Sequence, residues 1–118
     1  MRDPHKDFGR ISDMLDMALL LETEKDKHSF DDVQADRILF YGLSKMVEII
    51  GEAAYMVTKE FKNSHPQLPW RQIEGMRHIL VHGYYSISPE VLWDVIINDV
   101  PALIPVLKDY IREIKSEE

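Results

Sequence analysis

The sequence predicts an all-α protein, an up-and-down bundle of four or five helices. Apolar residues recur at helical spacing along most of the 118 residues, and no alternating pattern long enough for a strand interrupts them. Short polar links separate the helical segments, which favours antiparallel neighbours in a bundle. The length suits one domain with a real core, so we expect residues 1–118 to form a single domain.

The first helix is expected from about Pro4 to Glu24. Asp3 can cap it, and Pro4 stands at its first position, where the missing N–H costs nothing. Apolar residues then recur at helical spacing with acidic and basic residues between them. A short polar link over Lys25–Ser29 is expected to follow.

The second predicted helix is much longer. Ser29 or Asp31 can cap it, and its apolar stripe continues to about Lys62 without a proline. Gly42 and Gly51 are its weak points. Such glycines mark either the close approach of another helix or a local kink.

The third predicted helix contains the polar residues of greatest interest. Asn63–Pro66 ends the long helix, because the residue before a proline is pushed out of the α region. Pro69 then opens a helix at Trp70, and Ile73, Met76 and Leu80 form its buried side. We expect this helix to end near Gly83, since glycine is favoured just past a helix end.

The C-terminal part predicts two more helical segments. Ser88-Pro89-Glu90 repeats the cap-and-proline pattern of a helix start. The run Asn98–Pro101 is expected to break or bend this helix, with Asp99 as a new cap. A last helix carries apolar residues to a charged tail. Trp70 and Trp93 are interpreted as core or interface anchors.

Composition narrows the function classes. The chain has no cysteine, which excludes disulfides, thiolate metal sites and a cysteine nucleophile and suits a reducing cytoplasm. We see neither a signal peptide nor an apolar run long enough to span a membrane, so we expect a cytoplasmic protein. The net charge of −7 argues against broad electrostatic wrapping of nucleic acid, although a local pocket for one phosphate is compatible with it.

Arg77 and His82 form the strongest candidate for chemistry. Arginine is a permanent cation shaped to hold a phosphate, and histidine moves protons near neutral pH. These are the minimum for cleaving RNA without a metal. On an unbroken helix, positions five apart point about 140° away from each other at about 3.6 residues per turn. The two side chains therefore converge only if the helix loosens near Gly83 or the arginine reaches around. In the alternative, Arg77 pairs with a carboxylate and His82 caps the helix end.

Two further interpretations concern neighbouring residues. His78 and His82 have the i, i+4 spacing of metal ligands, but no other ligand cluster lies nearby and we assign neither a metal nor a cofactor. Tyr84 and Tyr85 are either packing and surface residues, or a base-stacking ring and a hydroxyl open to modification. Glu52, which follows Gly51 on the predicted long helix, could enter a cleft opposite Arg77.

The order of these motifs resembles the HepT-like branch of the HEPN superfamily. The similarity lies in Ile50-Gly51-Glu52-Ala53-Ala54, in Pro69–Ile73, in Gly75–Tyr84 and in Trp93, and it covers nearly the whole chain. Arg77, His82 and Tyr84 match the Arg-x4-His-x-Tyr motif of that branch position for position. One residue departs from the pattern: asparagine commonly follows the arginine, and here the position is His78, which could share proton transfer with His82 or replace the amide as a hydrogen-bonding group.

The resemblance implies an HEPN-like bundle that forms a homodimer with the two motif segments facing a shared cleft. It also implies a metal-independent endoribonuclease, the toxin of a type VII toxin–antitoxin pair, with Arg77 and His82 as catalytic residues. The implied antitoxin is a minimal nucleotidyltransferase that silences the toxin by transferring AMP to Tyr84. A non-catalytic interaction module that binds the nucleotidyltransferase or a nucleotide is the alternative.

Overall fold

The structure, a computed structural model, describes residues 4–79 and 88–117. Within these ranges the chain forms helices and no strand, which confirms the all-α prediction. A 3₁₀ turn over Pro4–Lys6 opens the chain, and a second one follows the fifth α-helix. The α-helices are α1 (Asp7–Lys27), α2 (Phe30–Ala35), α3 (Arg37–Met56), α4 (Lys59–Ser64), α5 (Trp70–Gly75), α6 (Pro89–Asp94) and α7 (Val100–Ser116).

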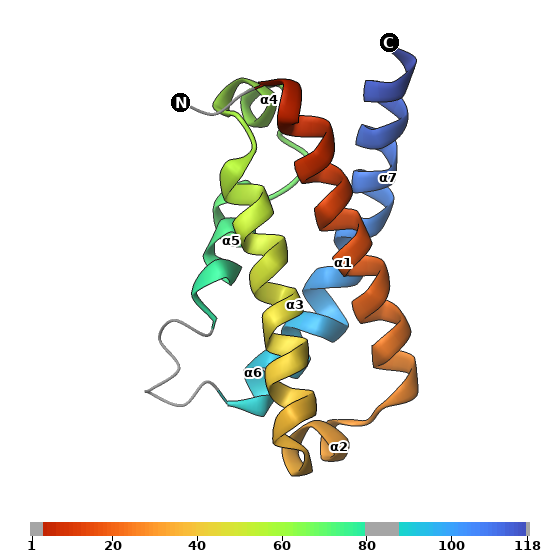
Figure 1. The fold of residues 1–118 in the computed structure, drawn as a ribbon, viewed down its shortest axis with the longest axis vertical. Coiled ribbons are helices and arrows are strands. Elements are labelled where there is room, and N and C mark those ends of the chain that lie inside the picture. The colour runs from red at the N-terminus through yellow and green to blue at the C-terminus, as the bar shows by residue number, and fades with distance from the viewer. Residues whose placement is uncertain (1–3, 80–87, 118) are drawn as a thin grey trace.

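The three long helices, α1, α3 and α7, form the body of the bundle. Helix α1 packs against both α3 and α7, and the shorter α5 packs against α3. Along the chain, α1, α3, α5 and α7 alternate in direction (Figure 1), which is the up-and-down arrangement that the short links predict. These helices and the segments between them share one hydrophobic core, whose largest fully buried side chains are Ile11, Met14, Leu21, Val33, Val47, Ile50, Val57, Ile73, Leu92, Ile96, Val100 and Leu107.

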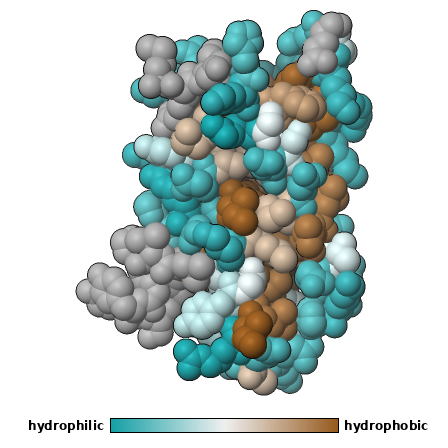
Figure 2. All heavy atoms as spheres, viewed as in Figure 1, coloured by the Kyte–Doolittle hydropathy of each residue, from teal (hydrophilic) through white to brown (hydrophobic). Residues whose placement is uncertain are grey.

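The surface mixes hydrophilic and hydrophobic residues. On the face drawn in Figure 2, hydrophobic side chains lie along the middle, over α1 and α3, among hydrophilic ones. No helix in the two described ranges is both long enough and apolar enough to cross a membrane.

The first helix extends beyond its predicted end. Helix α1 continues through Lys25 to Lys27, so the prediction of a polar link starting at Lys25 was wrong, and the link is His28–Ser29. Cations in the last turn of a helix are stabilised by the helix dipole, and Lys27 also pairs with Glu24 at 3.4 Å. The predicted cap, Asp3, lies outside the described residues.

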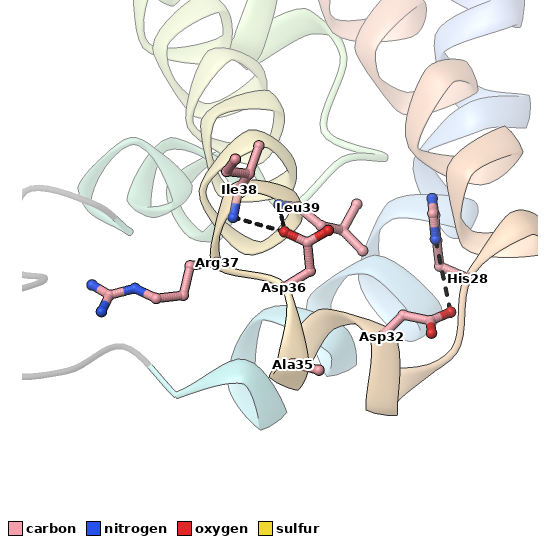
Figure 3. Close-up of a pocket in the computed structure, with 7 residues that line it drawn as sticks. All are labelled: His28, Asp32, Ala35, Asp36, Arg37, Ile38 and Leu39. Atoms are coloured by element: carbon pink, nitrogen blue, oxygen red, sulfur yellow. Dashed lines mark hydrogen bonds and ion pairs between the residues drawn. The ribbon is translucent and has the colours of Figure 1, made fainter.

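The single long helix predicted from Ser29 to Lys62 was also wrong, because it is three helices. Ser29 does cap the first of them, α2, as predicted: its hydroxyl accepts the N–H of Asp32, whose carboxylate accepts the N–H of Ser29. Asp36 then separates α2 from α3. One carboxylate oxygen accepts the N–H groups of Ile38 and Leu39, at 3.0 and 3.2 Å (Figure 3). An aspartate that satisfies two free N–H groups starts a new helix here.

The second break in the predicted long helix lies between α3 and α4, and a buried contact ties it to the start of α1. Helix α3 stops at Met56, and Thr58 caps α4 by accepting the N–H of Phe61 at 3.2 Å. Thr58 also donates its N–H and its hydroxyl to the carboxylate of Asp7, at 3.0 and 2.7 Å. Both residues are buried, so this contact ties the start of α1 to the junction of α3 and α4.

A cluster of aromatic rings fixes the start of α5. Phe61 stacks on His65, and Trp70 stacks on Tyr110 of α7. The main-chain carbonyl of His65 accepts both the indole N–H of Trp70, at 2.8 Å, and the hydroxyl of Tyr110, at 3.2 Å. Burial raises the pKa of Tyr110, and the charge of Glu113 adds to this effect. Helix α4 ends at Ser64, before Pro66, and α5 begins at Trp70, both as predicted.

The C-terminal helices are joined by a π-helical turn. Ser88 caps α6 by accepting the N–H of Val91 at 3.2 Å, which confirms that prediction. Residues Val95–Asp99 then form the π turn, and the chain passes obliquely from α6 to α7 (Figure 1), where a bend was predicted. The side chain of Asp99 makes no cap hydrogen bond, so its predicted role as a new cap was wrong.

Candidate functional site

The candidate site centres on a tight 3₁₀ turn, Met76–His78, that continues α5. Trp70, Ile73 and Met76 recur every three residues and are buried on the side facing the core. The α-helical geometry ends at Gly75, well before Gly83, where the sequence predicted the helix end. The loosening that Arg77 and His82 need in order to converge therefore begins before Arg77. In a 3₁₀ turn successive residues point about 120° apart at 3.0 residues per turn, so Arg77 and the exposed His78 project in different directions.

Gly51 of α3 allows this turn to pack directly on the helix. A β-carbon at position 51 would lie 2.2 Å from the main-chain nitrogen of Arg77 and 2.8 Å from the carbonyl carbon of Met76. No side chain fits at such distances. Of the two alternatives that the sequence left open for the glycines of this helix, the close approach is confirmed for Gly51. It does not apply to Gly42, where a β-carbon would have open space.

The guanidinium of Arg77 lies over the ring of Tyr55, 3.8 Å from its centroid. A cation over an aromatic face gains about 0.5–2 kcal/mol, depending on how far it is desolvated. Tyr55 stands one helical turn after Gly51 on α3, so the same helix contacts both the main chain and the side chain of Arg77. The Arg77 side chain keeps a quarter of its surface exposed.

One carboxylate links Arg77 to a second cation. Glu74 accepts a hydrogen bond from the ammonium of Lys62 at 2.8 Å, and its other oxygen lies 3.9 Å from a guanidinium nitrogen of Arg77. Lys62 also donates to the main-chain carbonyl of Tyr55 at 3.4 Å. Two cations share one acid, so the group carries a net positive charge. The Glu74–Arg77 ion pair is long and partly exposed, and such pairs contribute little to stability.

The predicted site residues stand as follows. Arg77 and His78 lie on the 3₁₀ turn, and His82 and Tyr84 lie outside the described residues, as do Tyr85 and Gly83. The convergence of Arg77 with His82 therefore stays a prediction. Glu52 is exposed on α3, and the carboxylate that the structure places beside Arg77 is Glu74. In the described part of the chain, no three histidine or acidic side chains lie together in a way that could hold a metal ion.

Sequence reasoning missed three residues around Arg77: Tyr55, Glu74 and Lys62. Two of them had a local signal. Glu74 stands three positions before Arg77, a spacing at which helical side chains meet, and Tyr55 stands four positions after Gly51 on the same helical face. Lys62 comes from α4 and had no such signal, because its approach depends on how α4 folds back toward α5.

Comparisons with known proteins identify the family of the chain. The sequence profile of the family described as "Ribonuclease HepT-like" matches residues 11–114. The chain belongs to the HepT-like ribonuclease family. The match includes Gly51, Tyr55, Glu74 and Arg77, so the whole candidate site lies inside the family's domain.

Named relatives point to the same family. A protein of Thermococcus cleftensis named "Probable ribonuclease HepT" is 33% identical over 103 residues, which cover 87% of this chain and 92% of the relative. A candidate RNase of Caldanaerobacter subterraneus subsp. tengcongensis is 34% identical over 74% of this chain and 78% of its own. A candidate RNase of Methanocaldococcus jannaschii is 33% identical over 76% of this chain and 74% of its own. No solved structure matches the chain significantly.

Proposed function

We propose that this HepT-like protein is a metal-independent endoribonuclease that acts as the toxin of a type VII toxin–antitoxin pair in the cytoplasm. Its membership of the HepT-like ribonuclease family supports the activity. The observation that carries the proposal is the geometry of Arg77: its main chain packs on Gly51, its guanidinium lies on Tyr55, and a quarter of its side-chain surface is exposed. A permanent cation held in this way suits a phosphate that gains charge during reaction.

The proposed reaction uses the 2′-hydroxyl of the RNA as the nucleophile. The 2′-oxygen forms a bond to the adjacent phosphorus while its proton passes to a base, and the bond from phosphorus to the 5′-oxygen breaks as that oxygen gains a proton. The products are a 2′,3′-cyclic phosphate and a free 5′-hydroxyl. Arg77 binds the non-bridging phosphate oxygens, whose negative charge grows in the transition state. To do so, the guanidinium exchanges its long contact with Glu74 for the phosphate and keeps its stacking on Tyr55. His82 is the general acid and base, and His78 is a second imidazole that could share the proton transfer.

A cleavage assay in EDTA tests the histidine assignment. Single-stranded RNA should be cut into fragments with cyclic phosphate ends, and His82→Ala should lower the rate at least about 100-fold, within the range that general acid–base catalysis contributes. His78→Ala should cause a smaller loss. A larger loss for His78→Ala would exchange the roles of the two imidazoles, and full activity of the double variant would reject histidine catalysis. The helical circular dichroism of each variant controls for folding.

A homodimer and a nucleotidyltransferase partner complete the proposal. Helix α3 exposes Ile38, Tyr41 and Tyr55 at intervals that place them along one helical face, and Ile38 is 86% exposed. Such a face suits a second copy of the chain, which would place the two Arg77 turns near one cleft. A minimal nucleotidyltransferase would then silence the enzyme by transferring AMP to Tyr84, because the added phosphate brings negative charge and bulk next to groups that bind substrate phosphate.

Intact mass measures this regulation directly. After co-expression with the nucleotidyltransferase, the chain should gain whole adenylyl units and lose RNase activity. Tyr84→Phe should gain none from that residue and stay active. Silencing without any mass change would indicate inhibition by binding alone.

A further inference from the structure

Residues of α4 and α5, two helices labelled in Figure 1, line a groove whose charge is unusual for this chain. Its volume is about 590 Å³, and we call it the cationic groove. Its lining includes three cations, one amide, one indole and one carboxylate: Lys59, Lys62, Arg71, Asn63, Trp70 and Glu74.

The charge balance of the groove is opposite to that of the chain. The sequence has 14 basic and 21 acidic residues, whereas three basic residues and one acidic residue line the groove. The single acid, Glu74, is already paired with Lys62 at 2.8 Å. Lys59 and Arg71 are exposed, so their charges face solvent. A local positive surface on an acidic protein selects a polyanion at that place and repels it elsewhere.

The cationic groove adjoins the candidate site at Glu74. Glu74 lines the groove with one carboxylate oxygen on Lys62 and places the other 3.9 Å from Arg77. Lys62, whose side chain is only 11% exposed, holds Glu74 in this position. An RNA strand whose scissile phosphate lies on Arg77 therefore has the cationic groove next to it, on the far side of Glu74. Asn63 adds an amide that can donate to phosphate or sugar oxygens.

We propose that the cationic groove binds the sugar–phosphate backbone of single-stranded RNA on one side of the scissile bond, with Lys59 and Arg71 contacting phosphates. This inference rests on the proposed ribonuclease function and names the residues that hold its substrate. Contacts of this kind give affinity without sequence preference and make binding sensitive to salt.

The salt dependence of binding tests the assignment. The probe is a fluorescent single-stranded RNA with 2′-O-methyl groups throughout, which the proposed reaction cannot cut, and its binding is followed by anisotropy. For single strands the slope of log K against log salt changes by about 0.7 per phosphate contact, so Lys59→Ala/Arg71→Ala should flatten it by about 1.4. The matched control, Lys108→Ala/Lys115→Ala, removes two exposed cations from α7 and should leave the slope at the wild-type value.

The outcomes separate this inference from the proposed function. If wild-type protein cuts unmodified RNA and both double variants share the wild-type slope, the groove assignment is wrong and the ribonuclease stands. If the Lys59/Arg71 variant keeps its slope and loses only its protein partner, the groove binds protein and the assignment is also overturned. If wild-type protein neither binds the probe nor cuts RNA, both proposals fail.

Discussion

Gly51→Ala is expected to lower the rate of RNA cleavage at least ~100-fold, because misplacing catalytic groups by about 1 Å costs that much. The new β-carbon would lie 2.2 Å from the main-chain nitrogen of Arg77, and a backbone atom cannot move aside as the end of a side chain can. The turn must shift away from α3 and carry the guanidinium off Tyr55. We expect a loss of stability of about 1–3 kcal/mol as well, as for other overpacked sites.

Gly9→Ala provides a matched control. Gly9 is an exposed glycine of α1, and a β-carbon there would have nothing within 4 Å. This variant should keep wild-type activity and gain about 0.5–1 kcal/mol of stability, the usual difference between alanine and glycine in a helix. The RNA cleavage rates and urea unfolding midpoints of Gly51→Ala and Gly9→Ala test this prediction. Equal activity of the two would show that the contact between Gly51 and the turn has no part in placing Arg77.

Asp7→Ala is expected to cause the largest loss of stability, about 3 kcal/mol. The substitution removes two buried hydrogen bonds to a charged acceptor, each worth about 1.5 kcal/mol or more, and leaves the N–H and hydroxyl of Thr58 without that acceptor. It also loosens the junction at which α3 ends and α4 begins. Urea unfolding measures the change directly.

Asp13→Ala is the comparison for this experiment. Asp13 belongs to the same helix and is exposed, so its substitution should change the unfolding free energy by less than about 0.5 kcal/mol. Asp7→Asn keeps one carbonyl acceptor and should fall between the two. An Asp7→Ala midpoint as high as that of Asp13→Ala would mean that the buried pair contributes nothing.

The contrast between Ser29 and Thr58 shows how far the sequence predicts this fold. Ser29, like Ser88, starts a helix by accepting an N–H three residues further on, so local patterns were enough to place it. Thr58 ends the predicted long helix because its N–H and hydroxyl bond to Asp7, which is 51 positions away. No residue near Thr58 in the sequence indicates that partner, so the apolar stripe predicts an unbroken helix through this position.

The candidate site likewise contains residues that the sequence predicts and residues that it does not. Arg77 could be selected from the motif, and Gly51 from its place in an apolar stripe. The ring of Tyr55 beneath Arg77 and the bridge from Glu74 to Lys62 depend on the packing of α3, α4 and α5, which helical spacing alone does not specify. The sequence therefore indicates Gly51, whereas the contacts of Tyr55, Glu74 and Lys62 around the arginine come from the structure.

The most direct measurement of the central claim is the rate at which Arg77→Ala cuts single-stranded RNA in EDTA. Removing one electrostatic stabiliser of a transition state costs about 100- to 1,000-fold, and we predict a loss of at least that size with unchanged helical circular dichroism. Arg112→Ala, which removes an exposed arginine of α7, should cut at the wild-type rate. If Arg77→Ala also cuts at the wild-type rate, the activity does not belong to this turn and Arg77 is not a catalytic residue.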